Sequence, residues 1–226
     1  ITGTDYTVAQ LKTINDATTG AIVLATSTSE ALSGDATDLA AALAGTINYT
    51  GDVTVTDNAY TIAELVAINA GTTGEIILNS AGVALSGTVA DIKSAFTGTV
   101  TEHTGTLEIT DAGTTDITAT DITSINTTNT GTITVANAID INGSGSEVKA
   151  AFDAIDTNTG NATANITGTD YTVAQLKAIN NKTTGAIVLA TSTSEALSGD
   201  ATDLADALAG TINYTGNVTV TDNAYT

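Results

Sequence analysis

The sequence predicts a right-handed α/β solenoid, in which short helices and parallel strands alternate in coils of about 27 residues. Two observations lead to this fold class. Residues 1–61 return as residues 166–226 with only five substitutions. Within this long period, glycine-led segments of alternating apolar residues are separated by short amphipathic segments with helix-capping residues in front of them. A β-solenoid with short helical decorations is the alternative fold.

A shorter period, of 54 to 57 residues, divides the chain into repeat units. Equivalent units begin at Ile1, Val55, Ile109, Ile166 and Val220. The expected units are therefore 1–54, 55–108, 109–165 and 166–219, followed by the start of a fifth at 220–226. The third unit is the most divergent. Because the pattern starts and stops within a repeat, we expect the chain to belong to a longer array.

Each expected strand starts with glycine and continues with alternating β-branched or aliphatic side chains, a pattern typical of strands. These strands begin at Gly20, Gly51, Gly74, Gly105, Gly131, Gly185 and Gly216, with a weaker one at Gly160. Further short strands are expected at 46–50, 99–100 and 211–215. Strands that alternate with short helices should be parallel, with right-handed crossovers.

Two kinds of helix are expected, each opened by a capping residue with an acid or amide three positions later. The first kind follows Thr7, Thr61, Thr118 and Thr172, and is expected to end at Asn15, Asn69, Asn126 and Asn180. Asparagine favours such ends because it tolerates a left-handed backbone. The second kind follows Asp35, Thr88, Ser144 and Asp200. Tyrosines before the first kind should pack onto it: Tyr6, Tyr60, Tyr171 and Tyr225.

The composition excludes several functional classes. The chain has 25 acidic and 5 basic residues and a net charge of −20, which repels nucleic acid and anionic membrane surfaces. It has no cysteine, so disulfides, thiol chemistry and Cys-ligated zinc are excluded. No apolar run reaches the roughly 18 residues of a membrane-spanning helix, and we expect no membrane insertion. The charge instead attracts cations.

Calcium is the cofactor that this charge suggests. Aspartates follow the strands and precede the first kind of helix: Asp5, Asp57, Asp111, Asp170 and Asp222. These are candidate metal ligands if calcium binds, because Ca²⁺ takes several carboxylate and carbonyl oxygens. Helix and turn chemistry is the other interpretation, since the sequence has no Asp-x-Asp-x-Asp-Gly loop and no glycine-rich calcium nonapeptide.

No catalytic residues are predicted, and we expect the chain not to be an enzyme. His103 is the single histidine and stands where Tyr49 and Tyr214 stand in sister units. We expect it to be a substitution at a turn, without a partner for base catalysis. Catalytic triads, phosphate-binding loops and pairs of distinct carboxylates are not present in the sequence.

The segment Tyr171-Thr-Val-Ala-Gln-Leu-Lys-Ala-Ile-Asn180 and its copies, in a background rich in Thr, Asn and Asp, resemble repeat regions of giant secreted bacterial surface, adhesin or filament proteins, of the cyanobacterial type. The resemblance implies an extracellular, cell-surface location and a structural role in a filament, surface layer or adhesin. We expect end-to-end or side-by-side self-association. The alternative function is an extracellular module that binds calcium or a surface glycan.

Overall fold

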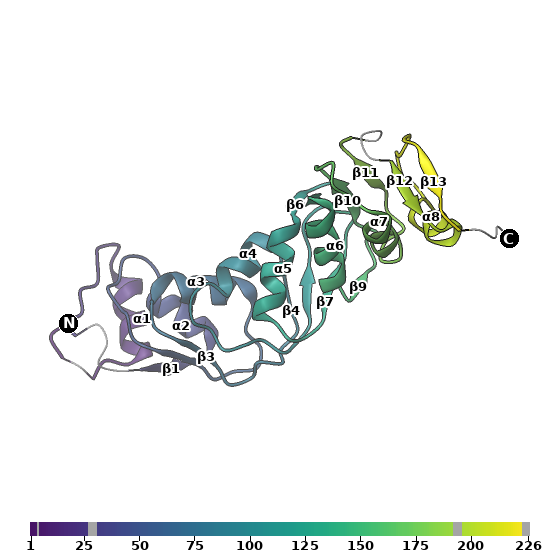
Figure 1. Cartoon of the computed structure of the whole chain (residues 1–226). Coiled ribbons are helices and arrows are strands. Elements are labelled where there is room, and N and C mark those ends of the chain that lie inside the picture. Colours follow the sequence, from purple (N-terminus) through teal and green to yellow (C-terminus); the bar gives the residue numbers. More distant parts are fainter. Residues whose placement is uncertain (4, 27–30, 192–195, 223–226) are drawn as a thin grey trace. The chain divides into compact units, whose positions relative to one another are not determined.

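The computed structural model has a mixed α/β fold in which helices alternate with parallel strands (Figure 1). It describes residues 1–3, 5–26, 31–191 and 196–222. The chain divides into two compact units, Ile1–Leu107 with Thr128–Gly131, and Glu108–Thr127 with Thr132–Thr226.

The first unit contains four helices and the strands beside them in its described residues. In chain order these are α1 (Val8–Ala17), β1 (Leu32–Gly34), α2 (Ala36–Leu43), β2 (Val53–Val55), α3 (Ile62–Gly71), β3 (Ile76–Leu78), β4 (Leu85–Gly87) and α4 (Val89–Ala95). Strand β5 (Leu107–Ile109) begins in this unit and ends in the second.

The second unit continues the alternation. Its elements are β6 (Asp116–Thr118), α5 (Ala119–Thr128), β7 (Ile133–Val135), β8 (Asp140–Gly143), α6 (Gly145–Ala154), β9 (Thr157–Asn158), β10 (Thr163–Ile166), α7 (Val173–Asn180), β11 (Ile187–Leu189), β12 (Leu197–Gly199), α8 (Ala201–Ala207) and β13 (Val218–Val220). The last residue of α5 belongs to the first unit.

The sheets are parallel and open, as expected for strands joined through helices. The first unit holds the order β1-β2-β3, and the second holds β11-β10-β8-β6 and the pair β12-β13. In register, Leu32 pairs with Val53, and Val53 pairs with Ile76. Helix α2 therefore connects β1 to β2, and α3 connects β2 to β3. None of the described sheets closes into a barrel.

Most glycine-led strands predicted from the sequence are confirmed. They correspond to β2, β3, β5, β7, β11 and β13, while the weaker segment after Gly160 contains β10. The segment after Gly20 contributes only one bridge, between Ile22 and Ile47. The other short segments likewise contribute single bridging residues, Val100 and Ile212.

The leading glycine is required by close backbone packing. A Cβ atom built on Gly74 would overlap the carbonyl oxygen of Gly51, and one on Gly131 would overlap that of Gly105. Overlap of this size cannot be relieved by rotating a side chain, since the opposing atom belongs to the backbone. Gly74, Gly105, Gly131, Gly160 and Gly185 therefore mark places where one coil of chain touches the next, whereas a Cβ on Gly20, Gly51 or Gly216 would meet only a side chain two residues earlier.

Strands β1, β4, β6, β8, β9 and β12 were not predicted. Three of them, β1, β4 and β12, are Leu-Ser-Gly triplets directly before a helix cap: residues 32–34, 85–87 and 197–199. Gly and Ser next to a capping residue favour a turn by local chemistry, and only the pairing partner makes the triplet a strand.

The predicted helix starts are confirmed. Capping boxes are present at Thr7 with Gln10, Thr61 with Glu64, and Thr172 with Gln175. Ser144 and Glu147 form a fourth. Caps from Asp35, Thr88 and Asp200 open α2, α4 and α8. Helix α5 begins directly after β6, and the Asp121 amide donates to the Thr118 hydroxyl.

The predicted helix ends are wrong in three of four cases. Only α7 ends at its asparagine, Asn180, whereas α1, α3 and α5 continue two residues further, to Ala17, Gly71 and Thr128. The side chains of Asn15 and Asn69 donate to carbonyls of the neighbouring helix. Asn180 makes the same kind of contact and does end its helix, so this contact does not determine where the helix ends.

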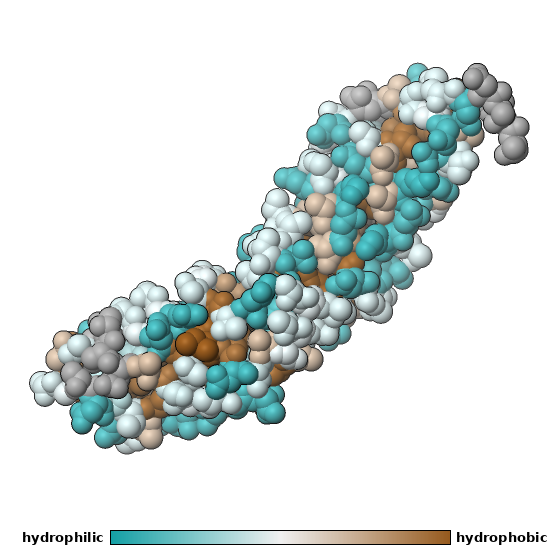
Figure 2. Space-filling model, turned by 60° about the horizontal axis from the view of Figure 1, so that its bottom comes forward, coloured by the Kyte–Doolittle hydropathy of each residue, from teal (hydrophilic) through white to brown (hydrophobic). Residues whose placement is uncertain are grey.

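Small aliphatic side chains form the core, with Leu11, Leu39, Leu65 and Ile68 fully buried. Hydrophobic residues reach the surface in Figure 2 as separate patches among hydrophilic ones. Within the described residues, no helix combines the length and hydrophobicity that crossing a membrane requires.

The tyrosines before the first kind of helix are buried, as expected for side chains that pack inward. Tyr6 and Tyr60 are at most 7% exposed, and Tyr171 is 3% exposed. Their hydroxyls donate to backbone carbonyls 20 residues further along the chain, those of Thr26, Ser80 and Thr191. Tyr225 lies outside the described residues.

Candidate functional site

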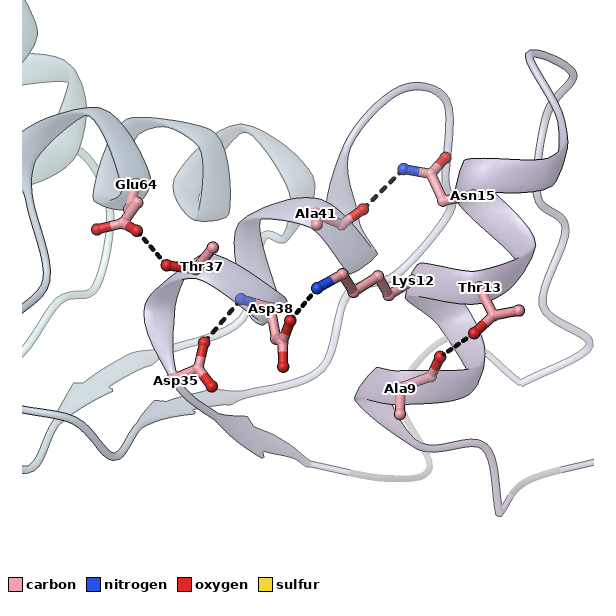
Figure 3. A network of polar contacts seen from close by, with 9 residues as sticks. All are labelled: Ala9, Lys12, Thr13, Asn15, Asp35, Thr37, Asp38, Ala41 and Glu64. Atoms are coloured by element: carbon pink, nitrogen blue, oxygen red, sulfur yellow. Dashed lines mark hydrogen bonds and ion pairs between the residues drawn. The ribbon is translucent and has the colours of Figure 1, made fainter.

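Polar side-chain contacts join α1 to α2, α2 to α3 and α3 to α4 in the first unit, and α7 to α8 in the second. In the first unit, Lys12 of α1 forms an ion pair with Asp38 of α2 (Figure 3). One turn further along α1, Asn15 Nδ2 donates to the carbonyl of Ala41 at 2.7 Å. Residues three apart share a helix face, so both side chains point to α2.

The second unit repeats this arrangement between α7 and α8. Lys177 contacts Asp203 at 2.5 Å and Asp206 at 2.9 Å, and Asn180 donates to the Asp206 carbonyl at 2.8 Å. The hydrogen bond and charge of Lys177 hold the pKa of Asp203 below its ordinary value. In turn, hydrogen bonds to Asp203 and then to Asp206 raise the pKa of Lys177.

The asparagine is the constant member of these contacts, and the lysine is not. Helix α3 has Val66 at the lysine position, yet Asn69 donates to the carbonyls of Ser94, Ala95 and Thr97 at 3.0, 3.0 and 2.7 Å. Ser94 and Ala95 lie in the last turn of α4, where backbone acceptors have no partner within the helix, and Thr97 follows the helix directly after its C-cap residue. The asparagine therefore caps the next helix.

A further polar contact links α2 to α3. The Thr37 hydroxyl donates to Glu64 Oε1 at 2.6 Å (Figure 3). Glu64 also accepts from the Thr61 amide and hydroxyl, through Oε2. Burial raises the pKa of Glu64, but the hydrogen bonds from Thr37 and Thr61 outweigh it and lower the pKa overall. The carboxylate is thus held ionised as a connector between helices.

These contacts have the chemistry of a structural joint. The paired side chains are between about one third and one half exposed, so water and salt weaken their attraction. The network consists of ion pairs, helix caps, threonine-to-glutamate hydrogen bonds and amide-to-carbonyl bonds. Its effect is to fix the spacing and register of neighbouring helices.

The five candidate calcium ligands occupy two different positions. Asp57, Asp111 and Asp222 lie two residues after a strand end, while Asp5 and Asp170 directly precede a buried tyrosine. Within a unit the candidates lie far apart along the chain. From the sequence, all five aspartates were expected to follow strands. The spacing did not show that they occupy two different positions.

Asp222 accepts hydrogen bonds at the N-terminus of helix α8. Both of its carboxylate oxygens accept from the Ala201 amide, at 2.9 and 3.1 Å, where α8 begins. Asp170 folds back on its own loop, because a Cβ on Gly168 would lie 2.6 Å from Asp170 Oδ1. Negative charge at a helix start is stabilising, which accounts for Asp222 without a metal.

Asp57 differs, since its Oδ1 atom is buried and has no hydrogen-bond partner among the described residues. It affects Tyr60 nearby: burial and then the charge of Asp57 raise the pKa of Tyr60 to about 12. The Tyr60 hydroxyl donates to the Ser80 carbonyl at 2.6 Å.

A metal site needs several ligands in one place. In the described parts of the chain, no group of three or more His, Cys, Asp or Glu residues lies close enough to hold a metal ion. Calcium normally takes six to eight oxygens. The calcium hypothesis stays a prediction for an experiment, with Asp57 as the candidate that has an unpaired oxygen.

His103 is fully buried and forms an isolated β-bridge with Asn129, so the expectation that it lies at a turn is wrong. Its Nδ1 lies 2.8 Å from Asn129 Oδ1, and its Nε2 lies 2.7 Å from the Val83 carbonyl. The Phe96 ring packs at 5.6 Å between centroids. In the sister unit, Tyr49 similarly bridges two backbone groups. The aromatic sister residue was the signal that this position is buried.

A cavity of about 330 Å³ lies beside the start of α1. Its lining includes Asp5, Tyr6, Val8, Leu32 and Ser33. Among the described lining residues, Asp5 is the one with a charged side chain. One carboxylate at the edge of an open cavity gives no defined ligand chemistry.

Comparison with known proteins found no match to a family model, to a curated protein or to a solved structure. The function is therefore inferred from the chain's own repeated contacts. The lysine–aspartate pairs were missed in the sequence, although Lys12 and Asp38 have the same spacing as Lys177 and Asp203. That recurrence follows from the long duplication, so in the sequence it did not distinguish this pair from the other repeated residues.

Proposed function

We propose that this chain is a structural segment of an extracellular surface filament, surface layer or giant adhesin. In this proposal the alternating elements form a right-handed α/β solenoid. The segment acts as an extended spacer that keeps a fixed distance between the parts of the protein it connects. Its partners are further repeat segments, joined end to end or side by side. The cell-surface location and the adhesin role rest on the sequence resemblance, together with the acidic composition.

One observation carries the proposal: the same contacts between neighbouring helices occur twice, formed by residues that lie 165 positions apart. The Lys12–Asp38 pair returns as Lys177–Asp203, and the Asn15 cap returns as the Asn180 cap. A ligand site needs one place that differs from its surroundings, whereas a rod needs every joint to be alike. Repetition of the joints therefore supports a scaffold.

The pairing of strands supports the solenoid part of the proposal. Asp140 pairs with Thr163 in the second unit, and Leu32 pairs with Val53 in the first, always in parallel. Parallel partners separated by one short helix are the geometry of a coil that advances by one strand spacing per turn.

Solution scattering tests the extended architecture. Chains with one, two and three tandem copies of residues 1–165 should show a maximum dimension that grows in proportion to copy number. A maximum dimension that grows only as the cube root of mass would overturn the solenoid, because that scaling belongs to compact globules.

Immunogold electron microscopy of the source cells tests the role. Antibodies raised against the chain should label fibres or a layer at the cell surface. Label confined to the cell interior would contradict the proposal. Thermal unfolding with calcium and with a chelator separates the alternative, since a calcium module loses stability on chelation and a metal-independent scaffold does not.

A further inference from the structure

We propose that His103 is a doubly protonated imidazolium that ties together the chain segments on either side of it, and that loss of one proton at rising pH loosens this contact. The pair of His103 with Asn129 is then a pH-sensitive joint inside the first unit. All the residues involved, which are Val83, Phe96, His103, Asn129 and Gly131, belong to that unit.

Both ring nitrogens of His103 face oxygen atoms that accept hydrogen bonds. Nε2 lies 2.7 Å from the Val83 carbonyl oxygen, and Nδ1 lies 2.8 Å from Asn129 Oδ1. A neutral imidazole has one N–H group and one bare nitrogen, whereas the imidazolium has two N–H groups. Only the imidazolium therefore donates to both oxygens at once.

Gly131 determines which end of the Asn129 amide faces the histidine. Asn129 Nδ2 donates to the Gly131 carbonyl at 2.9 Å, and Asn129 Oδ1 accepts from the Gly131 amide at 3.3 Å. Turning the side-chain amide over would place its NH₂ group against the Gly131 N–H and its oxygen against the Gly131 carbonyl, so both bonds would be lost. Asn129 therefore presents an oxygen to His103 Nδ1.

Two further features favour a positive charge at this position. The Phe96 ring lies 5.6 Å from the His103 ring between centroids, a distance at which an aromatic ring attracts a cation. The chain carries a net charge of −20, so a cation gains from the field of the whole molecule. Full burial opposes the charge, and two charge-assisted hydrogen bonds compensate for it.

Among the described residues no carboxylate forms an ion pair with the His103 ring. The charged residues on the segments around it are Glu102 on its own segment, Asp91 and Lys93 on α4, and Asp121 on α5. Carboxylates ordinarily change charge below about pH 5 and lysines above about pH 9, whereas histidine changes charge between these values. The histidine is therefore the group that makes this joint respond to pH near neutrality.

The sister joint uses hydroxyl groups at the same two positions. Tyr49 and Thr72 stand where His103 and Asn129 stand, each two residues before a strand glycine. The Tyr49 hydroxyl donates to a backbone carbonyl and accepts from a backbone amide, and the Thr72 hydroxyl does the same. A hydroxyl donates and accepts without a change of charge. Replacement of both hydroxyls makes the joint at His103 depend on a proton.

The switching step is the transfer of one proton to water. The Nδ1–H bond of His103 breaks, its electron pair stays on Nδ1, and the ring becomes neutral while Nε2 keeps its hydrogen and its contact with Val83. A lone pair on Nδ1 then faces a lone pair on Asn129 Oδ1, which is repulsive. Turning the Asn129 amide relieves the repulsion only by breaking both of its bonds to Gly131.

The direction of the pH effect follows from proton binding. The closed joint holds the proton more tightly than the open joint, because only the closed joint offers the two acceptors. A histidine in an unfolded chain has a pKa of about 6.5. The contact is therefore at full strength below about pH 6.5 and weakens as pH rises above it, by up to about tenfold in the opening equilibrium for each pH unit.

Hydrogen exchange of the native chain measures this opening. The Gly131 amide donates to Asn129 Oδ1, and the Gly74 amide donates to the Thr72 hydroxyl in the sister joint, so Gly74 is the internal control. The protection factor of Gly131, corrected for the intrinsic exchange rate, should fall at least about tenfold between pH 6.5 and pH 8.5. That of Gly74 should stay constant. The same pH dependence at both amides, or none at Gly131, would overturn the proposal.

Nitrogen NMR of the native chain reads the charge state directly, since His103 is the single histidine. At about pH 7.5 both ring nitrogens should show the chemical shifts of N–H groups, although a histidine in an unfolded chain is mostly neutral at that pH. One bare ring nitrogen in the folded chain at this pH refutes the imidazolium.

A double variant, His103→Tyr with Asn129→Thr, restores the hydroxyl pair of the sister joint. Protection of the Gly131 amide in this variant should no longer depend on pH. Dependence that persists there contradicts the proposal, because another group then carries it. If the variant does not fold, the exchange and NMR measurements on the native chain decide the question by themselves.

Discussion

Asn48 and Leu24 are joined by two hydrogen bonds that imitate a strand pair. The Leu24 amide donates to Asn48 Oδ1 at 2.7 Å, and Asn48 Nδ2 donates to the Leu24 carbonyl at 3.1 Å. Asn213 and Leu189 repeat the relationship at 2.7 and 3.0 Å. A side-chain amide thus satisfies the backbone groups of the neighbouring coil where regular strand pairing stops after a single bridge.

The substitution Asn48→Ala should destabilise the first unit by about 1–3 kcal/mol, because it leaves the Leu24 amide and carbonyl without a partner in a half-buried site. Chemical denaturation gives the free energy of unfolding. The exposed Asn58→Ala is the matched control and should have no comparable effect. An unchanged free energy for Asn48→Ala would mean that water replaces the amide.

The substitution Gly74→Ala should destabilise the chain by at least about 3 kcal/mol, since its Cβ would overlap the Gly51 carbonyl. Gly82→Ala is the control, because its Cβ would meet only Thr104 Oγ1, at 3.7 Å. Thermal unfolding of the two variants makes the comparison. Equal melting temperatures would show that the coils separate easily at this point.

The sequence predicts those features that each coil carries by itself. The strand start at Gly74 is predictable because the same glycine-led segment recurs along the chain. The helix start at Thr61 is predictable because its capping box with Glu64 is a local sequence pattern. The extra strand at Leu32 is not, since it depends on Val53 for its pairing. The role of Asn69 is not predictable either, because its partners are carbonyls of another helix. Contacts between coils require the fold first.

The ion pair between α7 and α8 should make a small contribution that depends on pH. Since Lys177 lowers the pKa of Asp203, this contribution is present above the ordinary value of 3.8 and is lost as pH falls through the lower folded value. The raised pKa of Lys177 removes it again only at strongly alkaline pH.

Denaturation midpoints of the native chain and of Lys177→Met test this contribution. The two midpoints should differ at neutral pH and converge in acid, and about 1 M salt should reduce the difference. Lys149→Met removes the same charge from a pair within α6, so it controls for net charge and should shift the midpoint less. A difference that persists in acid contradicts the assignment.

The Tyr60 phenol should titrate near pH 12, about two units above its ordinary value of 10.0, because burial and then Asp57 disfavour the phenolate. The ultraviolet spectrum of the phenolate measures this titration, and Tyr60→Phe identifies the signal. Asp57→Asn should lower the midpoint only slightly, since burial is the larger cause. The raised value also means that folding disfavours ionisation. Stability is therefore full below pH 10 and falls as pH rises towards 12.

The substitution His103→Ala should destabilise the first unit by about 2–4 kcal/mol, because it creates a cavity beside Phe96 and removes both ring hydrogen bonds. The control is Glu102→Ala, at the exposed residue next to His103. It should change the free energy of unfolding little. Hydrogen exchange at the Val83 and Asn129 segments would localise the loss. If exchange there stays slow, the histidine does not hold these two segments together, and its burial alone accounts for its position.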